Sequence, residues 1–244
     1  MIPDNDANAS PHGIGIRFYL GEHSHTDIVA HTHNGFPTRT GEEFLEMIRA
    51  VAATTPDSPK PTPVEKFMSA HPAALHFVQT PNPIPKSFAC ETFFAVTAFK
   101  FTNVEGVSHF GRFQILPLAK AEFYDDAEGK SQPPNFLVDE IATRVASEPV
   151  KFKVVVEIAE AGDNVNDATV SWPADRKQIE FGTITLDKIV PNDDAEAKRI
   201  IFDPIPRVDG IDPSDDPLIE LRSTIYLISG RKRRAEAATA AAGK

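Results

Sequence analysis

Cysteine is nearly absent from the sequence, which has Cys90 and no other among its 244 residues. One cysteine cannot form a disulfide within the chain, and such scarcity is typical of proteins kept in a reducing cytosol. We therefore interpret Cys90 as a small buried hydrophobic residue rather than as a reactive thiol.

Long apolar runs are missing as well. No stretch approaches the roughly 20 residues that a membrane-spanning helix needs. The first residues have neither a basic region nor an apolar segment, so we expect no signal peptide. Together with the single cysteine, these absences predict a cytoplasmic protein without a membrane span.

Positive charge is in deficit, because 25 Lys and Arg residues stand against 35 Asp and Glu residues and leave a net charge of -10. This balance argues against nucleic acid as a partner of the main body of the protein. The exception is the basic run at residues 231–234, which precedes an Ala-rich end. We interpret residues 231–244 as a solvated, disordered tail.

Several common catalytic and binding signatures are also absent. Gly13 and Gly15 lack the third glycine and the following helix of a phosphate-binding loop. The sequence has no Gly-x-Ser-x-Gly nucleophile elbow and no paired cysteines of the kind that hold zinc.

The hydrophobic pattern predicts strands with interspersed helices rather than a regular strand–helix alternation. Capping boxes, apolar stripes and a hairpin signal at residues 103–106 define the helices and strands. We expect helices over residues 40–51, from 62 onward, 135–147 and 214–230, and strands over 13–20, 27–31, 92–101, 107–116, 151–159, 168–172 and 179–190. This order predicts an α+β protein built on an antiparallel β-barrel with flanking helices.

Arg222 and Tyr226 lie four residues apart on the last predicted helix, so their side chains share a face. A free tyrosine keeps its proton up to about pH 10. A ferric iron and a fixed guanidinium would both favour the phenolate, and arginine does not lose its charge. Most such pairs in proteins are structural, so the spacing alone does not define a site.

Two His-x-His pairs, His23 with His25 and His31 with His33, lie close together near the N-terminus. Alternate residues of a strand face the same side, so each pair could chelate a metal ion such as zinc, copper or iron. The alternatives are solvated or core histidines and a single histidine in a ligand pocket.

Several segments together resemble the haem catalases, and among them the smaller catalase-related peroxidases. The resemblance is carried by residues 11–19 and 27–29, Phe36 and Phe44, residues 103–113, 172–173 and 182–186, and above all residues 202–218 and 222–226. It covers nearly the whole chain and is most specific at the C-terminal end.

The resemblance implies a haem b cofactor with Tyr226 as the axial ligand of the iron and Arg222 as the partner of that tyrosine. It implies that Phe36 and Phe44 pack against the haem and that His31 lies on the opposite, distal side as the catalytic candidate. Residues 1–230 would form one catalase-like haem domain. The distal-histidine segment of the family precedes the first matched strand, so the resemblance also implies a barrel that is incomplete at its N-terminus.

The implied activity is that of a haem peroxidase, an oxidoreductase that responds to oxidative stress. It would act on hydrogen peroxide or organic hydroperoxides with a small organic reductant, and it could assemble as a homo-oligomer. The alternatives are a haem-binding fragment or scaffold without turnover, an enzyme of the same fold that rearranges lipid hydroperoxides, and a small β-barrel enzyme with a histidine-bound metal.

Overall fold

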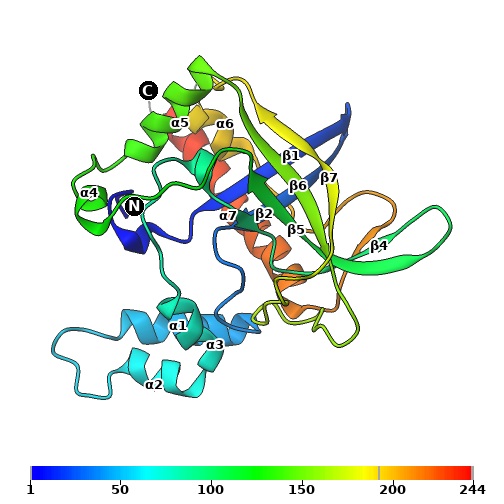
Figure 1. Cartoon of the computed structure of the whole chain (residues 1–244). Helices are drawn as coiled ribbons and strands as arrows, with labels where there is room; N and C mark the ends of the chain where they lie inside the picture. Colours follow the sequence, from blue (N-terminus) through cyan, green and yellow to red (C-terminus); the bar gives the residue numbers. More distant parts are fainter. Residues whose placement is uncertain (1, 192, 243–244) are drawn as a thin grey trace.

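A curled antiparallel sheet is the centre of the computed structural model, which describes residues 2–191 and 193–242 (Figure 1). Within these residues the sheet has eight strands. They are β1 (Gly13–Gly21), β2 (Ser24–His31), β3 (Phe93–Phe94), β4 (Phe99–Thr102), β5 (Ser108–Pro117), β6 (Val150–Ile158), β7 (Gln178–Leu186) and β8 (Ile211–Pro213).

The long strand β5 holds the sheet together. It pairs with β3 and β4 along one edge and with β6 along the other. The hairpin of β1 and β2 joins through β3, β7 joins through β6, and β8 joins through β4. Every pair is antiparallel, and the sheet curls into a half-barrel, which confirms the predicted fold class.

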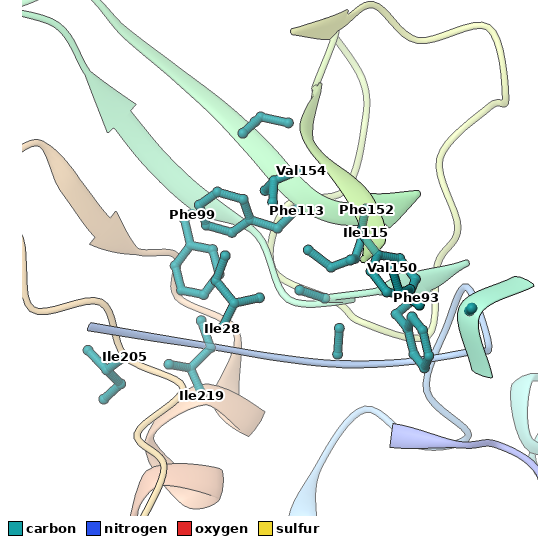
Figure 2. Packing of buried hydrophobic residues seen from close by; sticks show 14 of the residues in the cluster. Ile28, Phe93, Phe99, Phe113, Ile115, Val150, Phe152, Val154, Ile205 and Ile219 are labelled. Atoms are coloured by element: carbon teal, nitrogen blue, oxygen red, sulfur yellow. The ribbon is translucent and has the colours of Figure 1, made fainter. Parts of the chain in front are cut away.

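The core lies on the concave side of this sheet, where alternate residues of the strands converge (Figure 2). Phe113 and Ile115 from β5 meet Phe152 from β6, and Ile115 has no exposed surface. Ile28 from β2 and Ile219 from the last helix close the cluster. Burial of large side chains at about 1.5–3 kcal/mol each therefore fixes the last helix against the sheet.

The helices surround the sheet, and α1, α2 and α3 form a group at one end of it (Figure 1). The α-helices are α1 (Gly41–Ala52), α2 (Pro63–Ala70), α3 (Pro72–Gln79), α4 (Asp126–Lys130), α5 (Phe136–Ser147), α6 (Asp193–Arg199) and α7 (Pro217–Ala242). Two short 3-10 helices cover Ala7–Ala9 and Phe88–Cys90. Among the described residues, no helix is both long and apolar enough to cross a membrane.

The helix starts agree with the capping signals. Thr62 and Glu65 form a reciprocal capping box at α2, and the Thr40 hydroxyl accepts a hydrogen bond from the Glu43 amide at α1. Cys90 is buried, as its interpretation required, and burial raises the pKa of its thiol.

Two strand predictions differ from the structure. The segment 92–101 is not one strand. Residues 95–98 are buried and have no strand structure, and they separate β3 from β4. Residues 168–172 form a loop, because a backbone amide and an arginine side chain from elsewhere in the chain donate to its carbonyls. The Phe36 amide donates to Ala168 O, and the Arg112 guanidinium donates to Val170 O at 2.8 Å.

The helix predictions missed features that depend on tertiary contacts. Pro72 begins a separate helix, α3, with one residue between it and the end of α2, which the prediction of a helix from residue 62 onward did not resolve. The last helix does not end at Gly230 and continues through the basic run to Ala242. Arg233 donates to Ile200 O, and Arg234 donates to Arg199 O, so both fasten the helix to the end of α6.

Candidate functional site

The N-terminal half of α7 carries the predicted ligand tyrosine. Asp216 starts the helix, because its Oδ1 accepts from the Leu218 amide at 2.9 Å and Pro217 occupies the first turn. Leu218 and Ile219 are buried against the sheet. This anchorage fixes the rotation of α7 about its axis. It therefore also fixes the direction in which Arg222 and Tyr226, on the next turns, point.

Arg222 and Tyr226 contact each other on that helix, as their spacing predicted. The guanidinium donates through Nε and Nη2 to the Tyr226 phenolic oxygen at 3.4 and 3.3 Å. Both side chains are partly buried. Two donors from a permanent cation thus point at one phenolic oxygen, which stabilises negative charge on that atom.

His31 ends β2 and is mostly buried. Its Nδ1 has no hydrogen-bond partner among the described residues, although it has almost no exposed surface. The pKa of His31 is lowered to about 4, mainly by burial and also by the electrostatic effects of Arg222 and His33.

Phe36 and Phe44 extend the site from His31 toward α1. The ring centroids of His31 and Phe36 are 6.5 Å apart, and those of Phe36 and Phe44 are 5.2 Å apart. Phe36 packs against the cluster that contains Leu218 and Leu221 of α7. The structure therefore brings the residues predicted from sequence onto one region where β2, α1 and α7 meet.

The contact between α1 and α7 requires a glycine. A Cβ atom on Gly41 would lie 2.1 Å from Leu221 Cδ2, much closer than two carbon atoms can approach. Gly41 therefore lets the start of α1 lie directly on α7, one residue before Arg222. The sequence analysis did not single out this residue, because its effect depends on a packing partner 180 positions away.

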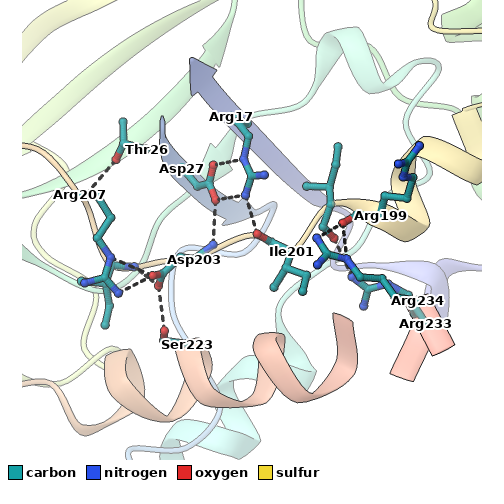
Figure 3. A network of polar contacts seen from close by, with 12 residues as sticks. Arg17, Thr26, Asp27, Arg199, Ile201, Asp203, Arg207, Ser223, Arg233 and Arg234 are labelled. Carbon is teal, nitrogen blue, oxygen red and sulfur yellow. Dashed lines mark hydrogen bonds and ion pairs between the residues drawn. The ribbon is translucent and has the colours of Figure 1, made fainter. Parts of the chain in front are cut away.

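A buried polar network also positions α7, and the sequence analysis missed it (Figure 3). Arg17 of β1 donates through Nε and Nη2 to the Asp27 carboxylate of β2, both at 2.8 Å. Asp27 also accepts from the Asp203 amide at 2.8 Å. The Asp203 carboxylate accepts in turn from the Ser223 hydroxyl of α7 at 2.9 Å, one residue after Arg222.

The His-x-His pairs do not form metal sites. His23 is 90% exposed, whereas the buried His33 contacts Asn82 and packs against Phe77. No group of three or more His, Cys, Asp or Glu side chains within the described residues is arranged to hold a metal ion. The β2 strand ends at His31, so His31 and His33 do not share the alternation that the chelation hypothesis assumed.

The depressed pKa of His31 predicts a dependence of stability on pH. The histidine takes up its proton near pH 6.5 in the unfolded chain but only near pH 4 in the folded one, so unfolding binds a proton between these values. The contribution of the neutral His31 imidazole to the free energy of unfolding is therefore complete above pH 6.5 and is lost as the pH falls toward 4. Between pH 7 and 4.5 it amounts to about 2–3 kcal/mol.

Urea unfolding at pH 7 and 4.5 measures this effect. We expect His31→Asn to lose less stability than the wild type across that range, while His23→Asn, at an exposed position, loses as much as the wild type. Equal pH dependence in all three proteins would show that the His31 imidazole is not desolvated.

Comparison with known proteins adds the family context. The family model for catalase matches residues 3–239. The catalase-related peroxidases of Synechococcus elongatus and Mycolicibacterium paratuberculosis are 32% and 29% identical to the chain. These alignments cover 93% and 91% of the chain and 68% and 70% of the two relatives.

The fold comparison agrees. A crystal structure of a fungal catalase superposes with a TM-score of 0.81 at 18% identity, over 95% of this chain. The chain spans about half of that catalase, because the match covers 49% of its length.

Proposed function

Since the chain belongs to the catalase family and therefore to the peroxide-acting oxidoreductases, we propose that it is a haem-dependent peroxidase whose iron is bound by Tyr226. The observation that carries this proposal is the pair of hydrogen bonds from the Arg222 guanidinium to the Tyr226 oxygen. An anionic oxygen ligand stabilises ferric iron, and a permanent cation beside it stabilises the phenolate.

The side chains near this pair also suit a haem. Phe36 and Phe44 offer apolar ring surface against which a flat macrocycle can pack, and the Phe36 ring already contacts the α7 cluster. His31 supplies an orphaned buried nitrogen, which is a polar atom that lacks a partner in the protein and can bind a ligand.

When bound, haem b supplies an iron that peroxide oxidises and that a second peroxide or an organic donor reduces again. The residues of this chain would prepare that chemistry. Arg222 would donate two hydrogen bonds to the Tyr226 oxygen, and Phe36 and Phe44 would exclude water from the reacting side. His31 is neutral at pH 7, so its Nδ1 can accept the proton that a peroxide loses and return it to the departing oxygen. Such proton transfer typically contributes about 10²–10⁴-fold to a rate.

Titration of the purified chain with ferric haem tests the proposal. We expect a Soret band that rises to saturation at an equimolar ratio, together with oxidation of a phenolic donor by hydrogen peroxide. Turnover of an organic hydroperoxide and release of dioxygen, measured beside it, separate peroxidase from catalase activity. A spectrum that stays that of free haem would contradict haem ligation by this chain.

We also propose a small organic molecule as the reductant and the cytoplasm as the location. The support for the location is the single cysteine, which is buried and free. The homo-oligomeric state and the single domain over residues 1–230 stay predictions.

A further inference from the structure

A large apolar cavity lies at the other end of β2 from His31. It has a volume of about 640 Å³, within the range of roughly 300–1,000 Å³ that is typical of sites for small molecules. Its wall includes Thr26 and Ile28 of β2. His31 lies five residues beyond Thr26, about 17 Å along a strand. None of His31, Arg222 and Tyr226 is among the described residues that line this cavity, so it is separate from the candidate haem site.

Aromatic rings form the centre of the wall. Phe101 of β4, Phe113 of β5 and Phe181 of β7 make edge-to-face contacts, with centroids 5.3 Å apart for Phe101 and Phe113 and 5.5 Å apart for Phe113 and Phe181. Phe18 of β1 lines the cavity as well. The rings thus come from four strands and present both faces and edges to the space between them.

The rim of the cavity leaves apolar side chains exposed. Phe181 is 58% exposed, Leu20 is 54% exposed and Val107 is 51% exposed, and all three line the same cavity. Neighbouring exposed apolar side chains of this size mark binding surfaces more often than scattered ones do. A bound apolar molecule would cover them and gain about 25 cal/mol for each Å² removed from water.

Charge decides what kind of molecule fits. No lysine or arginine is among the described residues that line the cavity, and its two acidic residues are Asp27 and Asp209. The Asp27 carboxylate is fully buried and already bound by Arg17 and by the Asp203 amide, so it does not offer a free charge. His109, Asn103 and Thr102 supply polar side chains on the β4–β5 hairpin. An anionic ligand would therefore lack a counter-charge.

From these observations we propose that the cavity is a binding site for a neutral aromatic small molecule. The phenylalanine rings supply the affinity by stacking and edge contacts, and the hairpin residues supply hydrogen bonds to an uncharged polar group. The site does not depend on haem, because none of its lining residues belongs to the region around Tyr226.

Titration of the full chain with N-phenyl-1-naphthylamine, an uncharged dye that fluoresces in apolar surroundings, tests the site. We expect saturable fluorescence, and an affinity that falls about tenfold or more in Phe181→Ser and in Val107→Asn. Both side chains are more than half exposed, so these variants should fold. Val138→Ser is the matched control, because Val138 is 56% exposed on α5 and lies outside the cavity, and it should bind as the wild type does.

Competition separates a neutral ligand from an anion of the same shape. Naphthalene-2-methanol should displace the dye, and 2-naphthoate should do so at least about tenfold less well, because the site has no cation to meet its carboxylate. Equal displacement by the two would overturn the assignment of a neutral ligand. Unchanged affinity in both cavity variants would overturn the site itself. A chain that excludes the dye, elutes as a dimer and becomes monomeric in Phe181→Ser would show that a second polypeptide covers the cavity instead.

Discussion

Replacing Tyr226 with phenylalanine should abolish the Soret band that the wild-type chain develops with ferric haem. Phenylalanine keeps the ring and its packing but removes the only oxygen that could reach an iron from this position. The Arg222 guanidinium would then have no phenolic oxygen to donate to. We expect the absorption spectrum of the mixture to remain that of free haem, and peroxide turnover to be lost with it.

Tyr124→Phe is the matched control for this experiment. Tyr124 is also partly buried, and its ring makes an edge contact with Phe136 far from α7 along the chain. Its replacement removes the same hydroxyl group and should leave haem binding unchanged. Arg222→Lys should bind haem more weakly, because an ammonium keeps the charge but cannot donate through two fixed nitrogens to one oxygen. A wild-type spectrum in Tyr226→Phe would place the ligand elsewhere.

Replacing Asp27 with alanine should lower the free energy of unfolding by about 3–5 kcal/mol. The carboxylate has no exposed surface, and its removal leaves the Arg17 guanidinium and the Asp203 amide without their partner. An unpaired charge away from water is costly because neither solvent nor protein compensates it. Urea denaturation at pH 7 measures the loss.

Two further variants separate the buried network from ordinary ion pairs. Glu180→Ala removes a pair of similar length, at 2.9 Å from Lys153, but one that is exposed on the same sheet, so we expect a loss of less than about 1 kcal/mol. The double change Arg17→Met with Asp27→Leu removes both charges and should recover part of the loss of Asp27→Ala. A similar cost for Asp27→Ala and Glu180→Ala would contradict the buried role of Asp27.

The network around Asp27 shows why some of the site could not be found from sequence. In the sequence, Asp27 is a single polar residue at the start of a predicted strand, and Asp203 lies in a Pro-rich segment. Their contact spans 176 positions, and only the curl of the sheet brings β2 beside the loop before α7. Gly41 is a similar case, because a side chain at position 41 would clash with Leu221 of α7.

Local signals predicted much of the rest. The Thr62 capping box, the alternation in β1 and the hairpin between β4 and β5 depend on residues that are neighbours in sequence, and each appears where it was expected. Arg222 and Tyr226 meet because four residues make slightly more than one helical turn. These features need no distant partner, so short stretches of sequence are sufficient to define them.

The predictions that differ from the structure depended on distant partners. Residues 168–172 have the composition of a strand, but Arg112 and the Phe36 amide bind their carbonyls, and no strand among the described residues pairs with them. The basic run after Gly230 has the composition of a solvated tail, but carbonyl oxygens at the end of α6 accept from Arg233 and Arg234.

The sequence by itself determined the family resemblance, the antiparallel class and the pairing of Arg222 with Tyr226, because motifs, alternation and helical spacing are local properties. Tertiary structure alone decided that His31, Phe36 and Phe44 lie where β2, α1 and α7 meet, that Asp27 and Asp203 hold α7, and that phenylalanines from four strands line an apolar cavity. Burial, electrostatic fields and packing distances depend on which distant segments meet, and that is set by the whole fold.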